Sequence, residues 1–117
     1  MAKTATKIKL VICDVTTKAE KLIWDAIEGK EVLRRARRKI LGARDKHCKL
    51  VLEGKIRIPR RWRKYDLLIF PQLWQNRDFE FADCLQWSSS GWRLVHHNMD
   101  CTLYGVANIR VVGVRKK

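Results

Sequence analysis

The sequence is poor in proline, glycine and acidic side chains. Its 117 residues include 2 prolines and 6 glycines, too few for a collagen-like or low-complexity chain. Hydrophobic residues make up 46%, which excludes a chain that is disordered by composition. Apolar runs such as residues 67–70 hold four residues, whereas a membrane-spanning helix needs about 20. We therefore expect residues 1–117 to form one soluble domain with a single modest core and no membrane partner.

Patterns for disulfides and metals are also absent. The cysteines are Cys13, Cys48, Cys84 and Cys101. They are separated by 35, 36 and 17 positions, so there is no CxxC pair, and no apolar targeting segment precedes them. We expect free thiols in a reducing compartment. His96 and His97 offer atoms that zinc binds, but adjacent side chains on a strand point to opposite faces. The sequence predicts no metal site.

Catalytic motifs are missing as well. The chain contains no GxGxxG, GxxxxGK[ST], GxSxG or HExxH pattern, which excludes the common signatures of dinucleotide binding, phosphate binding, acyl transfer and zinc proteolysis. No nucleophile, base and orienting group stand at a recognisable spacing. We therefore predict no catalytic residues, no cofactor and no enzyme activity for this chain.

Positive charge is what the sequence has in excess. Lys and Arg number 26 against 12 Asp and Glu, giving a formal net charge of +14. Residues 34–64, called here the basic block, hold fourteen basic and two acidic residues, while residues 1–33 and 65–117 each balance at +1. A protein that needs only solubility intersperses its charges. The basic block therefore indicates a polyanionic partner.

The composition of the basic block favours RNA. Arg outnumbers Lys there by nine to five, and a guanidinium binds phosphate bidentately and stacks on bases. No helix-turn-helix, zinc finger or basic zipper pattern argues for DNA. Trp62 either stacks on an unpaired base or packs in the core, and Tyr65 is a second stacking candidate. The predicted RNA-binding residues are Arg34, Arg35, Arg37, Arg38, Lys39, Arg44, Lys46, Lys55, Arg57, Arg60, Arg61, Trp62, Arg63 and Lys64.

The apolar pattern predicts one long helix followed by strands. An apolar stripe at helical spacing predicts a basic amphipathic helix over about 17–41, begun by a Thr17–Glu20 capping box, interrupted at Gly29 and ended by Gly42. The expected strands are 8–15, two short ones within 48–58, 66–70 ended by Pro71, and closing strands within 92–97 and 101–114. Residues 72–91 are expected to be irregular. The order predicts an α+β fold: a mostly antiparallel sheet, or a small partly open barrel, with one long helix near the N-terminus.

One segment resembles a known family. Residues 58–71, IPRRWRKYDLLIFP, are similar to the PRRW…DLLLLP stretch of tRNA wybutosine-synthesising transferases, which are related to archaeal-type tRNA guanine methyltransferases. Residues 91–104 are similar to that family more loosely, with a Gly-Trp pair, a His-Asn turn and a strand. In the family this stretch precedes the catalytic domain, in a part associated with tRNA. The resemblance implies RNA contact by Arg60, Arg61, Trp62 and Lys64, and no transfer chemistry, because the S-adenosylmethionine-binding domain is absent.

These observations lead to one main expectation and two alternatives. We expect a non-catalytic RNA-binding protein, a component or factor of a ribosome or another large ribonucleoprotein, with rRNA favoured over tRNA and with neighbouring proteins as further partners. The compartment would be the cytoplasm, with a mitochondrial or other organellar ribosome as the alternative. Lys3, Lys7, Lys9 and residues 115–117 would be short basic tails that order on RNA. The alternatives are an accessory or degenerate domain of a tRNA-modifying enzyme and a small, viral-type regulator of a nucleic-acid enzyme.

Overall fold

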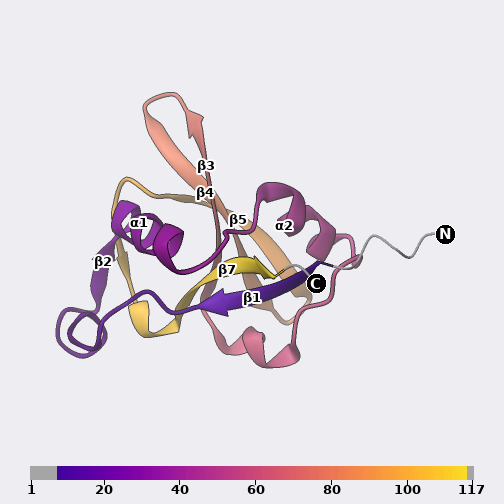
Figure 1. The fold of residues 1–117 in the computed structure, drawn as a ribbon, viewed down its shortest axis with the longest axis horizontal. Helices are drawn as coiled ribbons and strands as arrows, with labels where there is room; N and C mark the ends of the chain where they lie inside the picture. The colour runs from indigo at the N-terminus through magenta and orange to yellow at the C-terminus, as the bar shows by residue number, and fades with distance from the viewer. Residues whose placement is uncertain (1–7, 116–117) are drawn as a thin grey trace.

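A five-stranded mixed sheet forms the centre of the molecule (Figure 1). The structure is a computed structural model that describes residues 8–115. In spatial order the strands are β1 (Lys9–Cys13), β7 (Ile109–Arg115), β3 (Leu67–Asn76), β4 (Phe79–Ser88) and β5 (Gly91–Asn98). β7 runs parallel to β3, and every other neighbouring pair in this sheet is antiparallel.

Helices cover both faces of this sheet. The α-helix α1 (Gly29–Lys39) and a small second sheet of β2 (Ala26–Glu28) and β6 (Thr102–Tyr104) lie on one face. The α-helix α2 (Asp45–Leu52) and the 3₁₀ helix η3 (Arg60–Lys64) lie on the other. Alternate residues of β3 fill the two cores: Leu67 and Ile69 pack on the α1 side, and Leu68 and Phe70 pack on the α2 side. The central strands are therefore buried on both faces, and the two cores share them.

The predicted α+β fold with one long N-terminal helix is wrong. The expected helix over 17–41 is divided into the short π-helix η2 (Glu20–Trp24), strand β2 and helix α1. Asp25 ends η2 in the left-handed conformation at φ 51°. At Gly29 a Cβ atom would lie 2.6 Å from the carbonyl oxygen of Met99, so the start of α1 is pressed against the turn after β5. The capping box is confirmed, because Thr17 and Glu20 exchange two hydrogen bonds, but it begins about one turn of helix.

The predicted strands around Glu53-Gly54 are wrong too, because residues 45–52 form α2. His47 Nδ1 accepts the Arg44 N–H at 2.9 Å at the helix start, and Gly54 adopts φ 78° just after its end. The expected irregular segment 72–91 is the hairpin of β3 and β4, and Pro71 lies within β3 where the register shifts between Phe70 and Leu73. The β5 strand and the turn after it fall where the pattern placed them. A 3₁₀ turn, η4 (Val106–Asn108), precedes β7.

The chain passes from one face of the sheet to the other between β7 and β3. β3 pairs with β7 only along residues 109–111, and the crossing segment (residues 40–44) then takes over that edge of β7. The N–H of Ala43 donates to the carbonyl of Val112 at 3.1 Å, and the N–H of Val114 donates to the carbonyl of Leu41 at 2.8 Å. A Cβ on Gly113 would lie 2.8 Å from Ile40 Cδ1. The crossing segment therefore packs so closely on β7 that it leaves no room for a side chain at position 113.

We expect Gly113→Ala to lower the free energy of unfolding by about 1–3 kcal/mol, because the added methyl group must push the crossing segment off β7. Urea denaturation followed by far-UV circular dichroism measures this change. Ser90→Ala in the exposed β4–β5 turn is the control, expected to stay within about 0.5 kcal/mol of the wild type. Equal stability of the Gly113 variant and the wild type would contradict the close packing at this crossing.

Candidate nucleic-acid interface

A hollow on the α2 side of the sheet gathers three arginines around a tryptophan. This α2-side hollow has a volume of about 460 Å³. Its lining residues are Val51, Gly54, Ile56, Arg57, Ile58, Arg60, Arg63 and Trp92. No carboxylate is among them, and within residues 8–115 none of the three arginines forms an ion pair. Guanidinium groups next to an indole ring are the chemistry that holds phosphates and bases.

The 3₁₀ helix η3 positions two of these arginines, Arg60 and Arg63, next to the buried Trp62. Pro59 precedes η3, and the N–H of Trp62 donates to its carbonyl at 3.0 Å. Trp62 is 3% exposed and packs in the α2-side core, so its ring offers no face to a base. With Trp62 pointing inward, Arg60 and Arg63 line the α2-side hollow, while Arg61 lines a separate hollow. The structure thus settles the two interpretations of Trp62 in favour of the core.

Two other tryptophans, not Trp62, form an aromatic wall next to the arginines of η3. Trp87 of β4 and Trp92 of β5 are paired across the strands, and their rings meet edge to face with centroids 5.2 Å apart. The Arg63 guanidinium carbon lies 3.8 Å from the centre of the Trp87 ring. Tyr65 is covered instead, because the Arg110 guanidinium carbon lies 4.4 Å from the centre of its ring. Stacking on Trp87 holds the long side chain of Arg63 in place before any ligand arrives.

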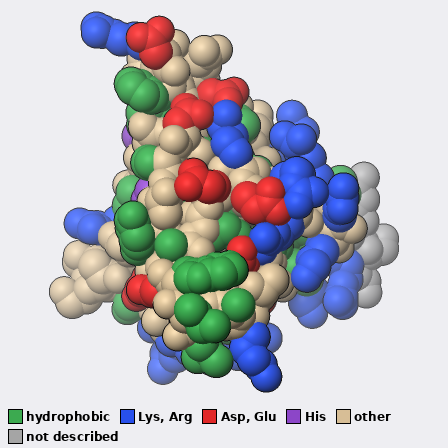
Figure 2. Space-filling model, turned by 90° about the vertical axis from the view of Figure 1, so that its left-hand side faces the viewer, with side chains coloured by type: hydrophobic (Ala, Val, Ile, Leu, Met, Phe, Trp, Pro, Cys, Tyr) green, Lys and Arg blue, Asp and Glu red, His purple; other side chains and the backbone are tan. Residues whose placement is uncertain are grey.

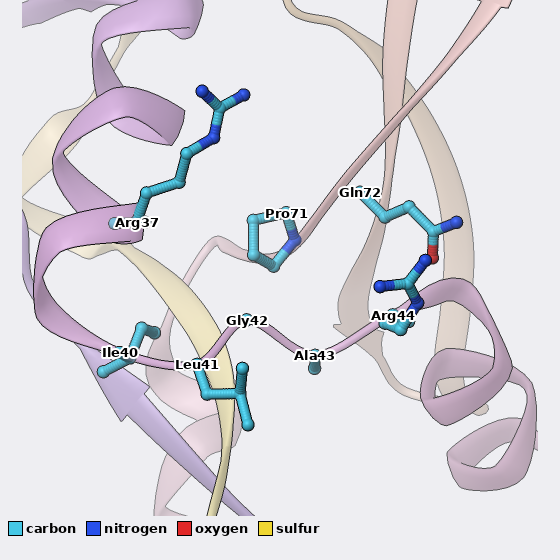
Figure 3. A pocket seen from close by; sticks show the side chains of 9 residues that line it. Arg37, Ile40, Leu41, Gly42, Ala43, Arg44, Pro71 and Gln72 are labelled. Carbon is cyan, nitrogen blue, oxygen red and sulfur yellow. The ribbon is translucent and has the colours of Figure 1, made fainter.

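A second basic hollow lies over the crossing segment (Figure 3). It has a volume of about 270 Å³. Arg37 reaches toward it from α1, and Arg44 from the start of α2 lies on the other side of Pro71. The side-chain oxygen of Gln72 accepts the Asp45 N–H at 2.8 Å and fixes the start of α2. Two cations from opposite faces of the sheet therefore line the same hollow, on either side of Pro71.

A third basic hollow, of about 470 Å³, lies along the outer strand β1. Lys9 and Arg115, which face each other in the β1–β7 pair, line it together with Arg61. Lys9 and Arg115 therefore belong to a folded basic surface rather than to tails. Lys3, Lys7, Lys116 and Lys117 lie outside the described residues.

Arg35 is a structural residue and not part of the exposed basic surface. Its guanidinium binds both carboxylate oxygens of Glu20, at 2.7 and 2.9 Å, and donates to the carbonyl of Val15 at 3.0 Å. It also pairs with Glu31 at 2.8 Å. Arg35 keeps the pKa of the buried Glu20 carboxyl below its usual value of 4.5, against the opposing effect of burial. The pair ties the η2 turn to α1.

The remaining cations of the basic block divide into paired and unpaired groups. Arg34 pairs with Glu31, whose pKa the two neighbouring arginines lower to about 2, and Lys55 pairs with Glu53 at 3.4 Å. Within residues 8–115 the predicted site residues without an ion pair are Arg37, Arg38, Lys39, Arg44, Lys46, Arg57, Arg60, Arg61, Arg63 and Lys64. All ten are exposed. The block therefore keeps most of its charge available to a ligand.

A polar cluster on β3, β4 and β5 is held together by one carboxylate. Asp83 Oδ1 accepts the indole N–H of Trp74 at 2.9 Å and lies 2.8 Å from His96 Nδ1. Nearby, burial and the negative charge of Asp83 raise the pKa of the Asp45 carboxyl. Among residues 8–115 no three His, Cys, Asp or Glu side chains are placed to hold a metal ion. No helix in the described part of the chain is long and apolar enough to cross a membrane.

The sequence pattern missed Trp87, Trp92, Lys9 and Arg115 as members of basic surfaces. The signal for the first two was present, because period-two alternation around the 88–91 turn would have placed Trp87 opposite Trp92 in a hairpin. Lys9 and Arg115 come together only through the β1–β7 pairing of the two chain ends. A local sequence pattern cannot predict this pairing, because the two residues lie far apart in the sequence.

We expect Trp62→Ala to cost about 3–5 kcal/mol of unfolding free energy, because the ring fills the α2-side core. Chemical denaturation measures the loss. Arg61→Ala, one residue earlier and exposed, is the matched control and is expected to change stability by less than about 0.5 kcal/mol. Similar small effects of both substitutions would show that Trp62 is not the anchor of η3.

The Glu20–Arg35 pair gives stability that depends on pH. Because the folded-state pKa of Glu20 is lowered, its contribution is present above pH 4.5 and is lost as pH falls through the folded value. We expect Glu20→Gln to lose about 2 kcal/mol at pH 7, between the values for exposed and fully buried pairs. The difference from wild type should shrink toward pH 3. Glu53→Gln, which removes an exposed carboxylate, should show neither effect, and a difference for Glu20→Gln that stays constant with pH would contradict the ion pair.

No family model, curated protein or solved structure matches this chain. Its function must therefore be inferred from its own residues. The features available are the three basic hollows, the aromatic wall of Trp87 and Trp92, and the unpaired arginines of η3.

Proposed function

We propose that the protein binds RNA without catalysis, as a component or factor of a ribonucleoprotein. The observation that carries this proposal is the α2-side hollow, where Arg57, Arg60 and Arg63 surround Trp92 and no carboxylate lines the wall. Three positive charges without ion pairs line one concavity and repel each other in the free protein. A polyanion relieves that repulsion and releases its own counterions when it binds.

The shape of the surface supports RNA as the polyanion. The second and third hollows add Arg37, Arg44, Lys9, Arg61 and Arg115 around the rest of the molecule. Such distributed sites suit a chain of phosphates that wraps the protein, as RNA strands do in ribonucleoproteins. In the α2-side hollow, Trp92 gives an unpaired base a ring to contact while the guanidiniums hold the flanking phosphates. A duplex DNA groove would need a protruding basic helix or ribbon. The arginines of η3 are held against the sheet by Trp62, and the protruding β3–β4 hairpin (Figure 1) carries one cation, Arg77.

We expect the triple variant Arg57→Gln, Arg60→Gln, Arg63→Gln to bind RNA at least about tenfold more weakly at low salt. The slope of log affinity against log salt should flatten by about 2, because three phosphate contacts to a single strand are lost. Fluorescence anisotropy with a labelled single-stranded RNA, titrated at several KCl concentrations, gives both quantities. The same sequence as single-stranded DNA tests the preference for RNA.

A second triple variant distinguishes RNA binding at the α2-side hollow from binding that depends on net charge alone. Lys18→Gln, Arg77→Gln and Arg93→Gln also remove three exposed charges, at positions outside the three basic hollows. This variant is expected to keep most of the affinity and the slope. If the two triple variants lose affinity equally, binding follows net charge alone and the α2-side hollow is not the site. Absence of RNA binding by the wild type would refute the proposed function.

A further inference from the structure

A cluster of large apolar side chains is exposed on the α1 side of the molecule. Leu22, Ile23 and Trp24 of η2 are 76%, 73% and 64% exposed, and Tyr104 of β6 is 70% exposed. Ala26 of β2 pairs with Tyr104, so η2 and this tyrosine belong to neighbouring chain segments. We call these four residues the apolar knuckle. Figure 2 shows hydrophobic side chains gathered low on this face. Lys and Arg side chains gather along its right edge, and a few lie beside the hydrophobic cluster at the bottom.

The apolar knuckle is held in a fixed shape. Thr17 and Glu20 cap the start of η2, and the Glu20 carboxylate forms an ion pair with Arg35. Lys21 pairs with Asp14 behind the turn. At the end of η2, the left-handed Asp25 accepts the Val106 N–H at 3.1 Å through its side chain. The exposure of three consecutive apolar residues is therefore built into the fold. Patches of this kind mark sites where another protein surface packs.

Local charge indicates which kind of partner covers the knuckle. Residues 18–28 carry two cations, Lys18 and Lys21, and three carboxylates, Glu20, Asp25 and Glu28. This segment has no cationic excess to attract RNA or an acidic protein. Two copies of a chain that carries +14 repel each other over most of their surfaces, and the repulsion is weakest where the charges are balanced. We propose that a second copy of this chain covers the apolar knuckle and forms a two-fold dimer.

The size of the patch agrees with a weak dimer. Four large side chains that are 64–76% exposed offer roughly 500 Å² of surface on each copy. Two copies would bury roughly 1,000 Å², at the lower end of specific interfaces. In a two-fold arrangement the knuckle packs on itself, with Trp24 and Tyr104 of one copy against the aliphatic residues of the other. Because the knuckle lies on the α1 side, the α2-side hollow stays open in both copies.

Sedimentation equilibrium of the full chain, freed of RNA by nuclease and high salt, tests the dimer. Over about 1–300 µM protein, the wild-type mass should rise from 13.8 kDa toward twice that value. Ile23→Glu and Trp24→Glu should each stay monomeric, because two like charges would meet across the two-fold axis. Both positions are exposed, so far-UV circular dichroism and the melting temperature should match the wild type. Phe79→Glu, at another exposed apolar side chain on the β3–β4 hairpin, is the matched control and should still dimerise.

Salt dependence separates this proposal from RNA binding. Salt screens the repulsion between two copies, so raising KCl should tighten the dimer while it weakens RNA affinity. A wild type that stays monomeric at the highest concentration, or a dimer that survives Ile23→Glu and Trp24→Glu, would overturn the proposal. A dimer that dissociates as KCl rises would also overturn it, because its contacts would then be electrostatic. None of these results bears on the α2-side hollow, whose variants are tested on RNA alone.

Discussion

The passage of the chain between β7 and β3 is the constraint on which the rest of the fold depends. A connection between helices on opposite faces normally runs around the edge of a sheet, because the interior of a sheet has no free hydrogen-bonding groups. Here β3 leaves β7 after three paired residues, and the crossing segment supplies the missing partners of β7. Gly113 leaves room for Ile40, and Gly42 lies so close to Pro71 that a Cβ would be 2.7 Å from its ring. Pro71 lies at the register shift in β3, at the place where the crossing segment passes between β7 and β3.

The crossing also determines where the positive charge goes. Because α1 and α2 lie on opposite faces, the consecutive cations of the basic block are spread over several surfaces instead of forming one stripe. Arg37 and Arg44 line the same hollow over the crossing segment, and η3 lies on the α2 side. There Trp62 fills the core and turns its neighbours outward into two different hollows. The burial of Trp62 in a short 3₁₀ helix thus places the side chains of Arg60 and Arg63 in one hollow and that of Arg61 in another.

The sequence could predict those parts of the fold that local chemistry determines. The β1 strand, the first half of β3, β5 and the Thr17–Glu20 cap follow from β-branched runs and a capping motif. The prediction of one long helix is wrong because its apolar stripe mixes residues in three different environments: Leu22 and Ile23 are exposed, Ile27 lies in a strand, and Leu33 lies in α1. Helix α2 was mistaken for strands because Leu50, Val51 and Leu52 are apolar in succession, and tertiary packing on β3 and β4 overrides that preference. Of the candidate site, the charge was visible in the sequence, but Trp92 and the grouping of the arginines depend on tertiary contacts.

Arg35 contributes to the net charge of the basic block, but its charge is used in ion pairs inside the protein. By position it belongs to the basic block, yet its guanidinium is satisfied by Glu20, Glu31 and the carbonyl of Val15. It serves instead to fix η2, and so holds the apolar knuckle out from the α1 face. Holding apolar side chains in water opposes the hydrophobic effect, so the turn that presents them needs directional bonds from charged groups to keep its shape. The same segment of sequence therefore supplies free cations on one side of the molecule and the ion pair that shapes an uncharged contact surface on the other. On this surface Glu20, Asp25 and Glu28 offset the charges of Lys18 and Lys21, so two copies of a chain that carries +14 repel each other less there than over the basic block.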